Sequence, residues 1–328
     1  MTSANTAAAS SIADDEESSK SGRSFRRTVG FAWIGVLVWL IRRCPWMLRA
    51  CRPMILRGVW CCSPWMRTSL LLNAARIIGP ESTPSQRQVL GRAVLANFIS
   101  AIEEVVMSGE RTNEELEAQL CDIEGIDGYR RARSVKRGLI LVTAHLGAFE
   151  TGMFVLRRHE PRVHVVFRRD AVPAFEAARS RLRARLGLLE APVDDGLPGW
   201  LRLRDALNNN EVILMQGDRV MDGQRGVPVP FMHGHILMPP GLVKLALATG
   251  APILPIFAPR RADGRVCIIM NEPIFVTSEH SRDPLEPAMR KLATAIEAQV
   301  RAHPEQWLSV HRAWCEDCQH MVPPGSPR

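Results

Sequence analysis

The chain alternates between short apolar runs and longer stretches in which apolar residues recur every three or four positions. Five runs of β-branched and aliphatic residues have the length of buried strands: GLILVTA, RVHVVF, EVILM, PILPIFA and RVCIIM. Most of them are separated by segments of helical composition, such as AVPAFEAARSRLRARLG and MPPGLVKLALATG. This alternation predicts an α/β fold with a mixed, largely parallel sheet flanked by helices.

The part of the chain that precedes these strands has a different pattern. Residues 85–133 are predicted to be largely helical, because VLGRAVLANFISAIEEVV has apolar residues at three- and four-residue spacing. The first two dozen residues contain almost no large apolar side chains and are expected to be a disordered tail. The predicted organisation is a tail, an apolar and basic helical segment, an α/β domain and a C-terminal tail, over residues 1–24, 25–84, 85–314 and 315–328.

An uncharged, apolar run over residues 28–41 lies between two pairs of arginines, at positions 26–27 and 42–43. It is shorter than the roughly twenty residues that a membrane-spanning helix needs. Charge on both flanks, and the lack of a small-residue cleavage site, argue against a secretion signal. Tryptophans, and arginines that can reach lipid head groups, favour a helix lying in the membrane interface. The alternative is a core helix packed on the domain.

The charge of the chain indicates which classes of molecule it can bind, and its cysteine content indicates the cellular compartment. The formal net charge is +8, and only four of the 42 basic residues are lysine, so the positive surface is almost entirely guanidinium. Arginine favours planar recognition of phosphate and carboxylate, so anionic lipid, nucleic acid and phosphorylated carriers are all candidate partners. A GC-rich genome that encodes arginine in place of lysine is the alternative explanation. Eight cysteines in 328 residues do not form a dense disulfide framework, which favours reduced thiols in a cytoplasm.

The segment VTAHLGAFETG contains a candidate catalytic pair. His145 follows the strand-like run GLILVTA, Gly147 allows a tight turn, and Glu150 comes five residues after the histidine. Functional residues of α/β proteins collect where strands end. His145 is therefore a candidate general base, with Glu150 as the carboxylate that orients its ring. The alternative is a histidine at a strand end beside a glutamate on a helix surface.

Two other predicted strands also end in charged residues. Arg168 follows the run RVHVVF, and the segment QGDR after EVILM contains Asp218 and Arg219. These residues are expected to lie on the same rim as His145.

The C-terminal residues His311, Cys315, Cys318 and His320 form an H-x3-C-x2-C-x-H cluster with the residue types of a zinc site. The usual zinc spacing is longer, and His311 also belongs to the segment WLSVHR, so no metal site is expected. The sequence has no G-x-S-x-G elbow, H-E-x-x-H helix or Walker-type phosphate loop. Their absence argues against the commonest serine hydrolases, zincins and nucleotide hydrolases.

Several motifs in order resemble the bacterial lipid A biosynthesis (lauroyl/myristoyl) acyltransferase family, within the H-x4-D/E lysophospholipid acyltransferases. After the basic-flanked apolar N-terminus come TAHLGAFE, VVFR, RLG, QGDR, VPFMHG, TGAPILPIF and WLSVHR. The resemblance covers about residues 25–312. It implies a lysophospholipid-acyltransferase-like fold and transfer of a fatty acyl group from a thioester, on acyl carrier protein or CoA, to a hydroxyl of a membrane lipid or glycolipid.

The resemblance also assigns roles to residues. It makes His145 the base and Glu150 its partner, and it places Arg168 and Asp218 in support of the site or in phosphate and substrate binding; Gly147 and Arg219 complete the expected substrate-binding set. HLGAFE differs from the HFGNWE of many relatives, and Arg169 stands where a proline is common. These departures concern the acceptor and leave the base unchanged.

The interpretation that follows is a monomeric acyltransferase at the cytoplasmic face of the inner membrane. The thioester is its co-substrate, and no other cofactor and no nucleic acid are expected. One alternative is a catalytically inactive lipid-binding or scaffold protein with the same fold. A basic nucleic-acid-binding protein is a further alternative, although the sequence has no recognisable reading module.

Overall fold

The computed structural model describes residues 39–108, 111–170, 172–220, 224–277 and 284–315. The expected tail over residues 1–24 lies outside these ranges. So do residues 25–38, which include most of the apolar run, and residues 316–328 of the expected C-terminal tail.

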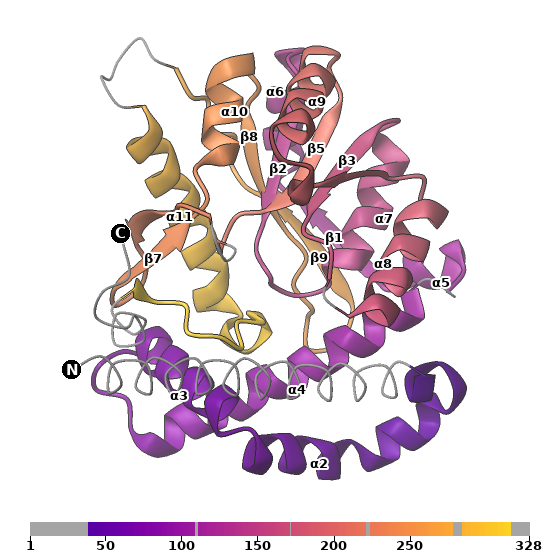
Figure 1. Ribbon diagram of the computed structural model, residues 1–328, viewed down its shortest axis with the longest axis vertical. Coiled ribbons are helices and arrows are strands. Elements are labelled where there is room, and N and C mark those ends of the chain that lie inside the picture. Colours follow the sequence, from indigo (N-terminus) through magenta and orange to yellow (C-terminus); the bar gives the residue numbers. More distant parts are fainter. Residues whose placement is uncertain (1–38, 109–110, 171, 221–223, 278–283, 316–328) are drawn as a thin grey trace, which may run out of the picture.

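A seven-stranded mixed sheet forms the centre of the fold (Figure 1). Its strands are β1 (Leu120–Glu124), β2 (Leu139–Thr143), β3 (Val163–Phe167), β4 (Leu189–Pro192), β5 (Val212–Gln216), β8 (Ile253–Phe257) and β9 (Val266–Met270). The order across the sheet is β1-β9-β8-β2-β5-β3-β4. Strands β8, β2, β5, β3 and β4 are parallel, whereas β9 is antiparallel to β8 and parallel to β1. The predicted mixed, largely parallel sheet is confirmed.

All five strands that the apolar runs predict are present. The structure also contains two edge strands and a hairpin that the sequence pattern does not predict. Strand β1 interrupts the region that is predicted to be largely helical, so that prediction is wrong at this point. Both β1 and β4 are short and mostly exposed or half-buried, because each lies at an edge of the sheet, and neither has an apolar run. The hairpin pairs β6 (Val227–Pro230) with β7 (His235–Met238) outside the main sheet.

The central strands are apolar throughout because helices cover both faces of the sheet. Successive side chains of a strand point to opposite faces. In β2, Ile140 and Val142 belong to one hydrophobic cluster, and Leu139 and Leu141 belong to another. Helices α9 (Gly196–Asn208), α10 (Gly241–Thr249) and α11 (Leu285–Ala302) pack on the first face, and α6 (Ile126–Ser134), α7 (Phe149–His159) and α8 (Pro173–Arg185) pack on the second.

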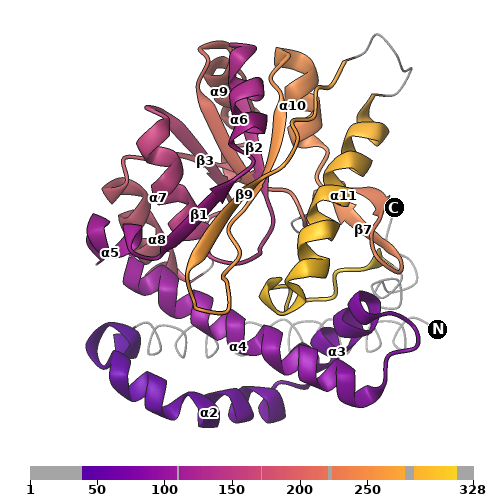
Figure 2. The same ribbon diagram turned by 180° about the vertical axis from the view of Figure 1, so that it is seen from behind.

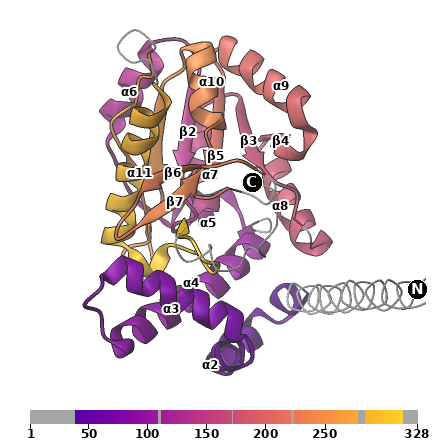
Figure 3. The ribbon, with the colours of Figure 1, turned by 60° about the vertical axis from the view of Figure 1, so that its left-hand side comes forward.

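The N-terminal helices form a separate layer across one end of the α/β unit (Figures 1 and 2). This layer contains α2 (Pro45–Cys62), α3 (Pro64–Ile78) and α4 (Pro84–Ser108), and the short α5 (Asn113–Glu117) follows it. A cluster of Trp60, Leu70, Val94, Leu95 and Ile99 holds the three helices together. Figure 3 shows from the side that α3 and α4 lie between α2 and the sheet.

After α11 the chain returns through the 3₁₀ turn η2 (Pro304–Gln306) and residues 307–314, which lie beside α4 and the end of the sheet (Figure 1). Isolated bridges join Trp307 to Leu146 and Trp314 to Ile236. The segment WLSVHR is therefore part of the end of the sheet where His145 lies.

Candidate active site

The register of two neighbouring strands brings His145 and Asp218 together. Strands β2 and β5 are parallel, with Thr143 opposite Gln216 at their last residues. Both chains leave the sheet at the same edge, so the residues two positions further along come opposite each other. Nδ1 of the His145 ring lies 2.8 Å from Oδ1 of Asp218, and the His145 backbone N–H donates to Oδ2 at 3.1 Å.

The Asp218 carboxylate is buried, and both of its oxygens have hydrogen-bond partners. Its side chain is 3% exposed, and the indole N–H of Trp307 donates to its Oδ2 over 2.9 Å. Burial by itself would raise the pKa of Asp218, but the adjacent His145 ring and the N–H donors of His145 and Trp307 hold this pKa well below its usual range. The carboxylate is therefore ionised, and it favours the His145 tautomer that has its proton on Nδ1 and its lone pair on Nε2.

His145 lines a cavity that contains most of the residues that the sequence places on this rim. Including open solvent at its mouth, the cavity has an empty volume of about 550 Å³. Its polar lining is His145, Arg168, Gln216, Arg219 and Gln224, and the rest of the lining is largely apolar. A basic and partly apolar cavity beside a histidine suits a substrate with both an anionic group and a hydrocarbon part.

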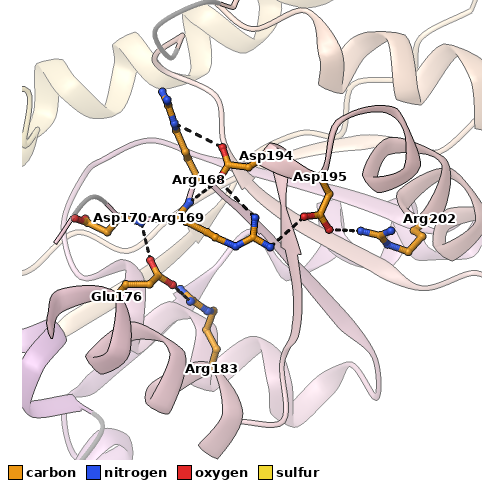
Figure 4. Close-up of polar contacts among 8 residues, drawn as sticks. All are labelled: Arg168, Arg169, Asp170, Glu176, Arg183, Asp194, Asp195 and Arg202. Carbon is orange, nitrogen blue, oxygen red and sulfur yellow. Dashed lines mark hydrogen bonds and ion pairs between the residues drawn. The ribbon is translucent and has the colours of Figure 1, made fainter. Parts of the chain in front are cut away.

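Arg168 leaves the end of β3 at the rim of this cavity, where an ion-pair network holds the loop (Figure 4). Its Nε lies 3.6 Å from Oδ1 of Asp194 in the 3₁₀ turn η1 (Val193–Asp195). The Arg169 backbone N–H donates to Asp194 over 3.1 Å, and its guanidinium lies 3.0 Å from Asp195, which also pairs with Arg202. Figure 4 shows the terminal nitrogens of Arg168 extending beyond Asp194.

One arginine of the basic helix α8 has a structural role. The Arg183 side chain is 3% exposed and pairs with Glu176 and Glu190. Its guanidinium carbon lies 3.9 Å from the centre of the Phe167 ring, at the end of β3. Glu176 in turn accepts the backbone N–H of Asp170 (Figure 4). Arg183 therefore helps to hold the loop that presents Arg168.

Gly147 sits where only glycine is compatible with the observed backbone. Its φ is +69°, and a Cβ at this position would lie 2.2 Å from the backbone oxygen of Ala258. The structure shows how Gly147 lets the loop after β2 pack against the end of β8. Substrate binding by Gly147 stays a prediction.

Glu150 lies in the first turn of α7, and its side chain is outside the described part of the structure. The contact at Nδ1 of His145, which the sequence interpretation assigns to Glu150, is made by Asp218. The predicted role of Glu150 stays a prediction.

His311 lies beside the cavity, with its Nδ1 3.4 Å from Nη1 of Arg219. Cys318 and His320 of the C-terminal cluster are outside the described residues. Within residues 39–315, apart from the gaps, no group of three or more His, Cys, Asp or Glu side chains is placed to hold a metal ion.

Trp307 is the main contributor to this site that sequence reasoning does not identify. The only signal for it is its place in WLSVHR, and a tryptophan is not one of the residue types that a search for catalytic pairs selects. Its contact with Asp218 spans 89 positions and depends on the tertiary fold.

Comparison with known proteins identifies the family of the chain. Residues 19–316 match the family described as bacterial lipid A biosynthesis acyltransferase. The phosphatidylinositol mannoside acyltransferase of Mycolicibacterium smegmatis is 25% identical over 249 residues, which cover 75% of this chain and 78% of that protein. The lipid A biosynthesis lauroyltransferase of Escherichia coli is 24% identical over 297 residues, which cover 85% of this chain and 90% of that protein.

Among solved structures, the 1-acyl-sn-glycerophosphate acyltransferase of Thermotoga maritima aligns with a TM-score of 0.34 at 14% identity, over 71% of this chain and 97% of that one. The match to the family extends over most of the chain. The chain belongs to the bacterial lipid A biosynthesis acyltransferase family.

Proposed function

We propose that this acyltransferase moves a fatty acyl group from an acyl thioester, on acyl carrier protein or CoA, to a hydroxyl of a membrane lipid or glycolipid. Membership of the family supports acyl transfer to a lipid. The observation that carries the chemistry is the contact between His145 Nδ1 and the buried Asp218 carboxylate, at a basic cavity. This arrangement is that of a general base with its orienting carboxylate.

The proposed reaction is a direct transfer. Nε2 of His145 accepts the proton of the acceptor hydroxyl as its oxygen attacks the thioester carbonyl, which gives a tetrahedral oxyanion. Collapse of this intermediate breaks the carbon–sulfur bond, and the protonated His145 returns the proton to the departing thiolate. Asp218 holds the ring in place and stabilises the imidazolium during these steps. The products are an ester and a free thiol, so atoms and charge balance.

The two arginines at the cavity supply positive charge. Arg168 and Arg219 line it together with His145, and we propose that they bind anionic groups of the acceptor or the donor. A guanidinium near the reacting carbonyl also stabilises negative charge as it develops on the oxygen. Glu150 is kept as a second candidate for the orienting carboxylate, because it lies five residues after the base in the first turn of α7.

We propose that the helical layer binds the membrane surface peripherally, at the cytoplasmic face of the inner membrane. On and next to α2 and α3, Trp39, Trp46, Met54 and Trp65 are 58%, 70%, 76% and 53% exposed. Exposed arginines lie among them at positions 43, 49 and 57. Each basic residue near an anionic membrane contributes about 1 kcal/mol, in addition to burial of the aromatic rings. In the described ranges, no helix has the length and apolarity that crossing a bilayer requires.

The proposal is tested by incubating the purified full chain, in detergent, with a radiolabelled acyl thioester and the lipid extract of its host. Label that moves into an alkali-labile lipid ester would support it, and mass spectrometry of that ester would name the acceptor. Lipid binding without consumption of thioester would instead support a lipid-binding protein with the same fold.

A further inference from the structure

The C-terminal segment that contains WLSVHR pairs with the loop that holds His145. The Leu308 backbone N–H donates to the His145 carbonyl over 2.7 Å, and the Gly147 N–H donates to the Gln306 carbonyl over 3.1 Å. An antiparallel bridge joins Leu146 to Trp307 between these two bonds. The segment therefore acts as a short extra strand along the catalytic loop, and the proposed mechanism assigns it no role.

Trp307 is the residue of this segment that reaches the acid–base pair. It is 2% exposed, and its indole N–H donates to Oδ2 of Asp218 over 2.9 Å. The other oxygen, Oδ1, contacts the His145 ring, so each carboxylate oxygen has a fixed partner. Because indole is a donor only, this contact favours the ionised carboxylate.

The indole ring is held in this orientation by its neighbours. Its centre lies 5.6 Å from that of Phe231 and 5.7 Å from that of Trp314, which meets it edge-on at 88°. Trp314 is itself fixed by an indole hydrogen bond of 3.0 Å to the Phe231 carbonyl. Both aromatic neighbours are fully buried. A change of the Trp307 rotamer would therefore require the whole cluster to repack.

The helical layer anchors the segment on both sides of Trp307. The buried Asn73 of α3 donates to the carbonyls of Ser309 and His311 over 2.9 and 2.7 Å, and it accepts the Ala313 N–H. Asn97 of α4 donates to the Glu305 carbonyl over 3.0 Å. These bonds connect helices next to the proposed membrane surface to the segment that carries Trp307.

We propose that Trp307 is a positioning residue of the acyl-transfer reaction, which acts by fixing Asp218 and through it the ring of His145. This inference rests on the proposed function, because it assigns Trp307 a part in that same site. It predicts that loss of the indole N–H lowers the rate of transfer more than loss of a comparable hydrogen bond nearby.

Trp314 provides a matched control for Trp307. Both side chains are buried in the same aromatic cluster and both donate one indole hydrogen bond, but only the bond from Trp307 reaches Asp218. The full-length variants Trp307→Phe and Trp314→Phe each keep an aromatic ring and lose one donor. We expect kcat to fall about tenfold more in Trp307→Phe than in Trp314→Phe, which corresponds to about 1.4 kcal/mol, with the thioester KM similar in the two.

A second readout does not require turnover. The ionised Asp218 has a depressed pKa in the folded state, so its stabilising effect is present above its unfolded pKa of about 3.9 and is lost as the pH falls through the folded pKa. Loss of the Trp307 donor makes the folded pKa less depressed. Between about pH 5 and about pH 3 both variants should lose nearly the same stability, because the folded carboxylate stays ionised in both. We therefore expect Trp307→Phe to lose less stability than Trp314→Phe as the pH falls below about 3, toward the folded pKa.

The other charged groups around His145 and Asp218 are the same in both variants. Arg168 after β3 and Arg219 after β5 line the cavity with His145, and His311 contacts Arg219. On the other side, Arg260 after β8 donates its backbone N–H to Gln306, next to Trp307, and pairs with Glu104 of α4. A difference in acid dependence between the two variants therefore reports on the contact of Trp307 with Asp218.

The outcomes separate this inference from the proposed function. Equal kcat and equal acid dependence in the two variants would overturn the role of Trp307. If the wild-type chain transfers no acyl group, the proposed function is wrong. Equal acid dependence of stability in the two variants would in that case also show that Trp307 does not stabilise the ionised Asp218. If Trp307→Phe does not fold, Asn73→Ala tests the anchored segment from outside the cavity: a lower kcat at similar KM supports the proposal, and an unchanged kcat overturns it.

Discussion

Nδ1 of His145 lies 2.8 Å from Oδ1 of Asp218, although the two residues are 73 positions apart in the chain. The contact arises because β2 and β5 are neighbours in parallel register and both end at the same edge of the sheet. The backbone N–H of His145 and the indole of Trp307 bind the other carboxylate oxygen. The geometry therefore makes Asp218 the first candidate for the carboxylate that orients the base.

The first prediction compares the two candidate carboxylates. We expect Asp218→Asn to lower kcat by about a hundredfold or more, because the amide can stabilise the wrong tautomer of His145 and cannot stabilise its imidazolium. The matched variant is Glu150→Gln, which likewise replaces a carboxylate with an amide, at the glutamate of the H-x4-E motif. Single-turnover rates should fall further in Asp218→Asn. The reverse order would assign the orienting role to Glu150, as the sequence interpretation does.

The second prediction concerns the turn after the base. Gly147→Ala would bring a Cβ to about 2.2 Å from the Ala258 backbone oxygen at a φ of +69°, and the backbone must shift to relieve this clash. We expect a loss of more than about 1 kcal/mol in the free energy of unfolding, together with a lower kcat. Gly264→Ala is a suitable control, because Gly264 also has a positive φ, of +83°, but an added Cβ there meets nothing within 4 Å. Equal activity in the two variants would show that this turn does not place the base.

The third prediction concerns Arg168 at the cavity. Arg168→Lys keeps the charge but loses the planar fork, so we expect weaker binding of an anionic substrate and a KM several-fold higher. Arg202→Lys is the control, since Arg202 belongs to the same ion-pair network but does not line the cavity (Figure 4). Steady-state kinetics with varied acceptor and varied thioester would show which substrate Arg168 contacts. An unchanged KM for both substrates would leave Arg168 with a structural role.

The fourth prediction concerns the surface of the helical layer. Replacing Trp46 and Met54 on α2 with serine should weaken binding to vesicles that contain phosphatidylglycerol by about tenfold or more, because these exposed side chains are available to enter the interface. Leu197→Ser on α9 removes a side chain that is 70% exposed on another part of the molecule, and it should have little effect.

Vesicle flotation at low and high salt gives the measurement for this fourth prediction. Binding of the wild-type chain should decrease with salt, because arginines contribute to it. Vesicle binding that is the same in the wild-type chain and the α2 variant would place the membrane contact elsewhere.

The sequence predicts the central strands, and it predicts which strand ends carry the residues that lie near His145. Apolar runs identify β2, β3, β5, β8 and β9 because both faces of these strands are covered. Strands β1 and β4 have no such run, since they lie at the exposed edges of the sheet. The rule that functional residues follow strand ends is sufficient to place Arg168, Asp218 and Arg219 near His145.

The sequence does not show which of these residues touch. The local H-x4-E spacing suggests Glu150 as the partner of His145, whereas the order of the strands brings Asp218 to Nδ1. Strand order depends on contacts across the whole domain, which no local pattern contains. The same holds for Trp307, whose role appears only when the C-terminal segment lies along the catalytic loop.

The most direct test of the account is transfer of a labelled acyl group in two forms of the full-length protein, the wild-type chain and His145→Ala. The assay measures label in extracted membrane lipid after addition of acyl thioester, with thermal unfolding recorded for both forms. The account predicts a labelled lipid ester with the wild-type chain, and a rate at least about a hundredfold lower in His145→Ala with similar thermal stability. Near wild-type transfer by a stably folded His145→Ala variant would contradict it.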